Sequence, residues 1–146
     1  GSDNMWSIAE DELMERITES TKATIDFFGE NICYVNVMRN MSVDCDCAGV
    51  EAAPVVTPNV GILGSLDILS IDQACVDIIF GMKEGERAAM VERIKTRHGL
   101  RQLSCMKEMG MGSDDYVILD MDNDLNEITA KEAAADCVPF VGGKTV

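Results

Sequence analysis

The sequence predicts a mixed α/β domain with a small sheet. Apolar residues recur every three or four positions in several stretches, which indicates amphipathic helices, whereas residues 31–39 and 116–121 alternate as strands do. The predicted elements follow the order helix, strand, loop, strand, three helices, strand. We therefore expect about three strands packed with about four helices. With 146 residues, the chain has the size of one domain with a real core.

The first predicted helix follows a capping box, Ser7–Glu10, in which the serine is the N-cap and the glutamate reaches back to it. Apolar residues then line one face from Met14 to Phe28, and Gly29 ends the helix. The next stretch, "NICYVNVMR" (31–39), is largely apolar on both faces, which is typical of an interior strand.

The other elements follow from the same signals. Residues 40–60 contain Pro54 and Pro58 and are predicted to form a long loop. After it we expect a short strand at 60–63, a helix opened by a second capping box at Ser70–Gln73, helices at about 86–98 and 100–109, a strand at 116–121, and a short helix capped by Thr129 and Glu132.

For the domain organisation, we expect residues 1–5 to be a tag scar or linker and 6–122 a single α/β domain cut from a longer protein. Residues 123–146 are expected to be an extension with a short helix and a loose tail.

The charge balance excludes several partners. Twelve basic residues against 26 acidic ones give a net charge of −14, which repels nucleic acid and anionic membrane surfaces. No apolar run reaches the roughly 20 residues of a membrane span. Six cysteines occur at irregular spacing without a signal peptide, so we expect reduced thiols and a cytoplasmic location.

The stretch "VDCDCAG" (43–49) is the first candidate site. On an extended backbone, Cys45 and Cys47 point to the same side with Cα atoms about 6.6 Å apart, and modest bending lets both sulfurs reach one metal at about 2.3 Å. The neighbouring Asp44 and Asp46 raise thiol pKa values, which disfavours a redox pair but suits a bound cation. Two thiols do not complete a four-ligand site, and incidental or structural cysteines remain the alternative.

Two aspartates form a second candidate site. Asp67 and Asp72 flank the start of a predicted helix beside the turn Gly61–Gly64, where they would act as acid–base or metal-binding carboxylates. The alternative is a tight turn followed by a self-capped helix. His98, the one histidine, lies before Gly99 at a predicted helix end, where a cation suits the helix dipole.

The acidic run "DMDNDLNE" (120–127) is a solvated turn rather than a calcium loop. A calcium-binding EF-hand loop needs glycine at its sixth position and glutamate at its twelfth, and this sequence has Leu125 and Lys131 there.

A longer stretch carries a family resemblance. Residues 34–79 contain the CDC loop and the segment "GILGSLDILSIDQA", and "MGMGSDDYVIL" (109–119) follows. Together these blocks closely resemble the C-terminal part of iron–sulfur centre proteins in domain of unknown function family 362, over about residues 6–121. The sequence departs from that pattern at Val43, Asn59, Ile68 and Ser70, where the family usually has Pro, Asp, Pro and Ala.

The resemblance implies a relationship to iron–sulfur proteins. Related chains carry a ferredoxin module upstream, with four-cysteine runs that this sequence lacks. The resemblance therefore implies an iron–sulfur cluster or other metal, completed by the missing part of the parent protein. The expected partners are that ferredoxin portion or another redox protein.

We thus expect a binding or electron-transfer module with Cys45, Cys47, Asp44 and Asp46 as candidate metal ligands. One alternative is an enzyme domain that uses Asp67 and Asp72, and the other is a folding domain that dimerises through an apolar sheet face. The sequence assigns no reaction.

Overall fold

The computed structural model describes residues 8–44, 51–135 and 137–139. Nine elements occur in these ranges, in the chain order α1 (Glu10–Phe28), β1 (Tyr34–Met38), β2 (Gly61–Ser65), α2 (Ile68–Gly81), α3 (Glu84–Thr96), α4 (Gly99–Glu108), β3 (Ile118–Asp120), β4 (Asn126–Ile128) and α5 (Ala130–Ala135). Among the described residues, no helix is both long and apolar enough to cross a bilayer.

The α/β class is confirmed, but the strands form two separate antiparallel pairs rather than one sheet of three. β1 pairs with β2 in the register Tyr34 to Ser65 and Met38 to Gly61. β3 pairs with β4, a strand that the sequence analysis missed. β4 reads Asn-Glu-Ile, so its three residues carry little β-propensity and no alternation to detect.

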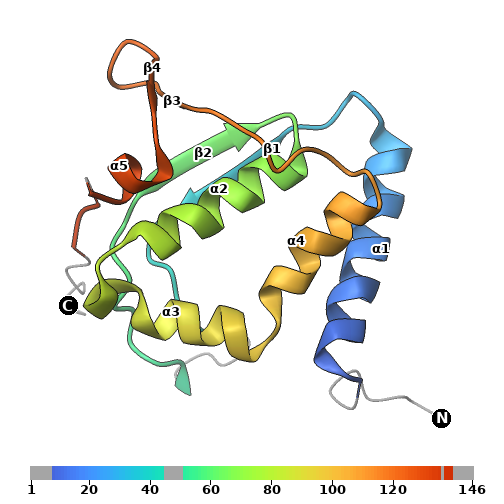
Figure 1. Ribbon diagram of the computed structural model, residues 1–146, viewed down its shortest axis with the longest axis horizontal. Helices are drawn as coiled ribbons and strands as arrows, with labels where there is room; N and C mark the ends of the chain where they lie inside the picture. Colours follow the sequence, from blue (N-terminus) through green and yellow to red (C-terminus); the bar gives the residue numbers. More distant parts are fainter. Residues whose placement is uncertain (1–7, 45–50, 136, 140–146) are drawn as a thin grey trace.

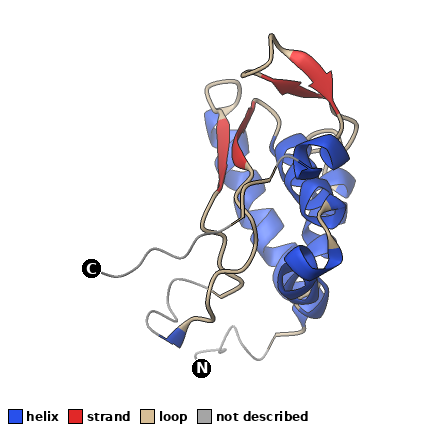
Figure 2. Cartoon of the chain, turned by 90° about the vertical axis from the view of Figure 1, so that its left-hand side faces the viewer, coloured by secondary structure: helices blue, strands red, loops and turns tan. Residues whose placement is uncertain are grey.

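The β1–β2 pair and the helices form two layers. Figure 2 shows the helices on one side of this pair, while its other face is open, and Figure 1 shows α2 lying along it. The side chains of Val35, Val37 and Ile62 point to the open face and are 61%, 59% and 66% exposed. One face of this sheet is therefore apolar and uncovered by the described chain.

Helix α2 organises the core because it contributes to both buried clusters. In the first cluster, Ile78 and Ile79 pack with Met38 of β1 and Ala134 of α5. In the second, the fully buried Leu69 packs with residues of α4. This explains why α2 is apolar around most of its circumference.

Helix α1 packs against α4 (Figure 1). The buried Thr18 donates its hydroxyl proton to the Met14 carbonyl at 2.9 Å, and the Gln102 carbonyl of α4 lies at 3.5 Å. Gly29 ends α1 with a positive φ of 56°, as predicted. Ala9 is the N-cap without a side-chain bond, and Ser7 of the predicted capping box lies outside the described residues.

The predicted cap of α2 is wrong by three residues. The N-cap is Asp67, not Ser70, because the Asp67 carboxylate accepts the Ser70 N–H at 2.9 Å. The predicted box around Thr129 is confirmed, since Glu132 accepts the Thr129 N–H at 2.7 Å and returns its own N–H to the threonine hydroxyl.

The segment after β4 packs on the core. A Cβ atom added to Gly81 of α2 would lie 3.3 Å from the Cβ of Ala134, so α5 approaches the helix backbone closely. A bridge between Asn59 and Val138 adds a further contact with the loop before β2. Residues 140–146 lie outside the described range.

Candidate functional site

The CDC stretch begins at a residue that is held firmly. Asp44 accepts a hydrogen bond from the Arg93 guanidinium of α3 at 2.6 Å through Oδ1, and from the Ala53 N–H at 2.8 Å through Oδ2. Cys45, Asp46 and Cys47 lie outside the described residues. Asp44 and Ala53, on the two sides of this stretch, are thus hydrogen-bonded to each other, and Arg93 holds Asp44 to α3.

Both oxygens of Asp44 already have partners, so the carboxylate is placed to hold the loop. Its ion pair with Arg93 is partly exposed, with side-chain exposures of 23% for Asp44 and 40% for Arg93. A pair of that exposure contributes about 1 kcal/mol or less to stability. Its main effect is therefore to position the loop, and no local pattern signals a partner 49 residues away.

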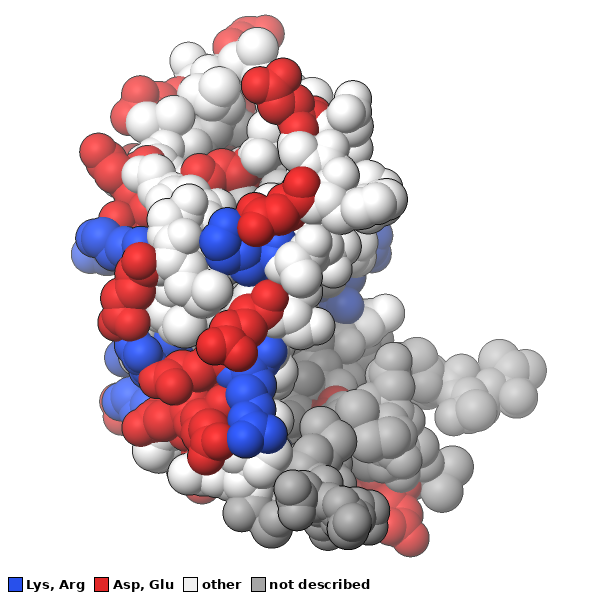
Figure 3. All heavy atoms as spheres, turned by 90° about the vertical axis from the view of Figure 1, so that its right-hand side faces the viewer, with Lys and Arg blue, Asp and Glu red and all other residues white. Residues whose placement is uncertain are grey.

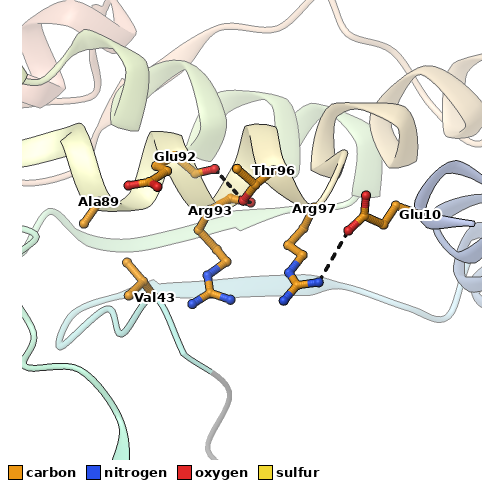
Figure 4. Close-up of a pocket in the computed structure, with 7 residues that line it drawn as sticks. All are labelled: Glu10, Val43, Ala89, Glu92, Arg93, Thr96 and Arg97. Atoms are coloured by element: carbon orange, nitrogen blue, oxygen red, sulfur yellow. Dashed lines mark hydrogen bonds and ion pairs between the residues drawn. The ribbon is translucent and has the colours of Figure 1, made fainter. Parts of the chain in front are cut away.

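A polar cavity of about 480 Å³ lies beside this anchor (Figure 4). Arg93 and Arg97 project from α3 into it, and Arg97 pairs with Glu10 at 3.4 Å. The lining residues are Glu10, Val43, Ala89, Glu92, Arg93, Thr96 and Arg97. Because both arginines have acidic partners, their charges are already balanced within the chain.

The segment that returns from the loop to β2 contains an unusual threonine. Thr57 is fully buried, and its hydroxyl is the one buried side-chain polar atom without a hydrogen-bond partner in the described part of the chain. Nearly all such groups in folded proteins are paired, so this hydroxyl marks a place where a partner atom would be favourable.

Asn59 lies in the same segment and joins it to the end of β1. Its side-chain oxygen accepts the Asn40 N–H at 2.7 Å, and Asn40 has a positive φ of 53°. An amide oxygen can accept this bond as a carboxylate can. The Asn59 side chain therefore fixes the position of the turn after β1 relative to the segment that leads into β2.

Asp67 joins the start of α2 to a distant turn. Its Oδ1 accepts the Ser70 N–H and its Oδ2 accepts the Ser113 N–H, both at 2.9 Å. The Ser70 hydroxyl donates to the Ser113 carbonyl at 2.7 Å. A Cβ atom at Gly112 would overlap the Asp67 carboxylate, so the "GMGS" turn can approach only with glycine there.

Asp72 has different partners. Its carboxylate accepts a bond from the Asn36 amide of β1 at 2.8 Å, and the same amide lies 3.3 Å from the Cys75 sulfur. Burial raises the pKa of the Cys75 thiol, with a further contribution from Asp72, while the Asn36 bond opposes the rise. Cys75 is therefore a protonated, weakly reactive thiol at neutral pH.

A further aspartate, Asp77 of α2, was not predicted as a site residue and binds a tyrosine. The Tyr116 hydroxyl donates to Asp77 at 2.6 Å, and Gln73 donates to the other oxygen at 2.9 Å. Burial, and then the bond to Asp77 and its charge, raise the pKa of the Tyr116 phenol. Asp77 and Tyr116 lie 39 residues apart, and no local pattern in the sequence signals that they meet.

The two predicted acidic-site residues are not brought together for acid–base chemistry. Asp67 and Asp72 are held by separate partners, and neither lines either of the two cavities described for this chain. Their bonds support the alternative reading of a capped helix tied to its neighbours. No group of three or more His, Cys, Asp or Glu side chains suited to a metal occurs among the described residues.

His98 has a structural role. It adopts a left-handed conformation with φ of 52° at the start of α4, and its Nδ1 lies 2.7 Å from Asp11. The hydrogen bond to Asp11 and its charge raise the pKa of the imidazole, with a smaller contribution from Glu10. Figure 3 shows the surrounding face, where acidic and basic side chains are interleaved.

Comparison with known families gives one match. The family model described as Domain of unknown function (DUF362) matches residues 2–77, which is more than half of the chain. This range includes the CDC stretch, Asp67 and Asp72. Neither the curated proteins nor the solved structures gave a match.

Proposed function

We propose that this chain, which belongs to the family described as Domain of unknown function (DUF362), is the binding or electron-transfer module of an iron–sulfur-type protein. In this proposal the CDC loop contributes Cys45 and Cys47, with Asp46, to a metal or cluster site. The family description assigns no reaction, so the proposal rests on the loop itself.

The anchoring of Asp44 is the observation that carries the proposal. A loop with two thiols one residue apart binds a metal more favourably when its ends are fixed, because ordering a free loop costs conformational entropy. The bonds from Asp44 to Arg93 and Ala53 fix those ends. The buried, unpaired hydroxyl of Thr57 in the returning segment is a second sign of an incomplete polar environment there.

The described residues do not fit a complete [4Fe–4S] site by themselves. Such a cluster needs four thiolates, and the described cysteines belong to separate elements: Cys33 precedes β1, Cys75 is in α2, Cys105 is in α4 and Cys137 follows α5. The remaining ligands would come from the ferredoxin portion of the parent chain or from another redox protein.

The test is metal analysis of the protein purified anaerobically, by iron, sulfide and zinc content and visible spectra. We expect Cys45→Ser and Cys47→Ser to remove the metal, and Cys33→Ser, which alters an exposed cysteine before β1, to leave it unchanged. The same three variants are then made in the parent chain that contains the ferredoxin portion, and their iron, sulfide and zinc contents are measured in the same way. Unchanged metal content in the Cys45→Ser, Cys47→Ser double variant of that parent would refute the proposal.

The open face of the β1–β2 sheet favours homodimerisation as a second candidate role. Val35, Val37 and Ile62 lie next to each other on it and are mostly exposed. Sedimentation velocity over a concentration series tests this role. A dimer that Ile62→Glu dissociates would support it, and a monomer at the highest concentration would refute it.

A further inference from the structure

The free edge of β1 borders an apolar groove. A cavity of about 310 Å³ is lined by the four consecutive residues 35–38 of β1 and by no residue of β2. It therefore lies along the edge of β1 that faces away from β2. Its floor comes from the helix layer, with Ile79 of α2 and Met90 and Ile94 of α3. Every residue that lines this groove is uncharged.

The backbone of β1 presents hydrogen-bonding groups to this groove. The Met38 carbonyl accepts the Val60 N–H, so it points to the β2 side. In an antiparallel pair, residues alternate between exchanging backbone bonds with the partner strand and turning these groups away from it. Val35 and Val37 consequently turn their N–H and C=O groups to the free edge, where no other described strand pairs with β1.

β1 lacks the features that protect natural edge strands. Exposed edges are commonly blocked by charged residues, proline or a bulge, because unpaired backbone groups recruit other strands. The sequence of β1, Tyr-Val-Asn-Val-Met, contains neither a charge nor a proline. Its composition predicts an interior strand, whereas in this chain it is paired on one side only.

We propose that this groove binds one extended peptide segment of another protein, which adds to β1 as a third strand. Backbone bonds to Val35 and Val37 would supply the affinity, and alternate apolar side chains of the segment would enter the groove between β1 and α3. This binding site is independent of the CDC loop and of any metal.

A single segment fits the groove better than a second copy of the chain. The side chains of Met90 and Ile94 form the floor beside β1, so the helix layer extends past the edge of the sheet. A neutral or basic segment is also not repelled by this chain of charge −14, whereas a second copy is, and a dimer through the open sheet face must overcome the same repulsion.

The test uses a capped synthetic peptide, Lys-Val-Thr-Val-Thr-Val-Lys, and the amide NMR signals of the whole protein. We expect the Val35 and Val37 amides to shift on titration and their hydrogen exchange to slow about tenfold or more when the peptide is bound. The matched control is the same peptide with N-methyl groups on alternate amides, which cannot complete the backbone ladder. This control shows whether backbone hydrogen bonds carry the binding, and it needs no substitution in the protein.

A second pair of variants tests the groove floor. Met90→Lys places a charge in the groove and is expected to weaken peptide binding about tenfold or more, while Val56→Lys, at an exposed valine in the loop before β2, leaves it unchanged. The absence of any shift with millimolar peptide would overturn the proposal. The proposal would also be overturned if the N-methylated peptide bound equally well. The same holds if self-association of the protein protected the Val35 and Val37 amides from exchange.

Discussion

The Asp67 carboxylate connects the first turn of α2 to Ser113, 46 residues further along the chain. One oxygen caps the helix through the Ser70 N–H and the other holds the Ser113 N–H, each at 2.9 Å. A single side chain therefore sets both the start of the central helix and the position of the turn after α4. Its role is architectural, and it can be tested by stability measurements.

Asp67→Ala is expected to lower the free energy of unfolding by about 1–2 kcal/mol, the usual cost of losing an N-cap. The loss of the second bond, to Ser113, places the expected value at the upper end of this range. Urea denaturation followed by circular dichroism measures it. Asp115→Ala serves as the control, because the exposed Asp115 side chain makes no hydrogen bond or ion pair with the described residues, and it should change stability by less than about 0.5 kcal/mol.

Gly112→Ala is expected to destabilise the protein by about 1–3 kcal/mol, because the new Cβ would overlap the Asp67 carboxylate. Gly85→Ala is the matched control, since it lies in the exposed first turn of α3 with open space around it. There alanine should stabilise by up to about 1 kcal/mol through its higher helix propensity. Equal effects of the two substitutions would show that the contact with Asp67 is unimportant.

Tyr116→Phe removes the hydroxyl that donates to Asp77 and is expected to cost about 1.5–3 kcal/mol, the range for hydrogen bonds to charged groups. Tyr34→Phe is the comparison, because no hydrogen bond of the Tyr34 hydroxyl occurs among the described residues, and it should be close to neutral. Thermal unfolding of both variants measures the difference. A neutral Tyr116→Phe would mean that Asp77 has an equally good solvent partner.

Thr57→Val replaces a buried, unpaired hydroxyl with a methyl group of similar shape and is expected to stabilise the isolated chain by about 1 kcal/mol. Thr24→Val on the exposed side of α1 is the control and should have little effect. Chemical denaturation gives both values. A destabilising Thr57→Val would indicate that the hydroxyl has a partner in solution.

The His98–Asp11 pair predicts a pH dependence. The imidazole pKa is raised in the folded protein above its ordinary value of 6.5, so protonation favours the folded state. This contribution to stability is complete below the ordinary pKa and disappears as the pH rises through the folded value. The melting temperature of the wild type should therefore fall more between about pH 6 and pH 8 than that of Asp11→Asn. Parallel pH profiles would refute this role for the pair.

Local patterns predicted most of the fold. Helical periodicity located α1 to α4, and the Thr129–Glu132 box located α5, because these signals depend on neighbouring residues only. The pairing of strands depends on tertiary contacts, which is why one sheet was expected and two pairs were found. The cap of α2 was misplaced because Asp67 and Ser70 are both good N-cap residues, and the choice depends on the contact with Ser113.

The candidate site was predictable only in its residue types. The motif pointed to Cys45 and Cys47, but Arg93 was not foreseen as the anchor of Asp44, since an arginine in a polar helix is ordinary. Likewise, Asp67 and Asp72 could be selected as acidic residues near one helix start. Their bonds to Ser113 and Asn36, which decide their roles, come from elements far away in the sequence.

The packing of α1 against α4 has a consequence for biosynthesis. The contacts that fasten α1 join it to residues more than 80 positions later: Thr18 to Gln102, Glu15 to Arg101 and Asp11 to His98. At about 5–20 residues per second, a ribosome needs several seconds to make the intervening chain. Helix α1 therefore leaves the ribosome seconds before its docking surface on α4 exists, and until then its inner face is available to chaperones.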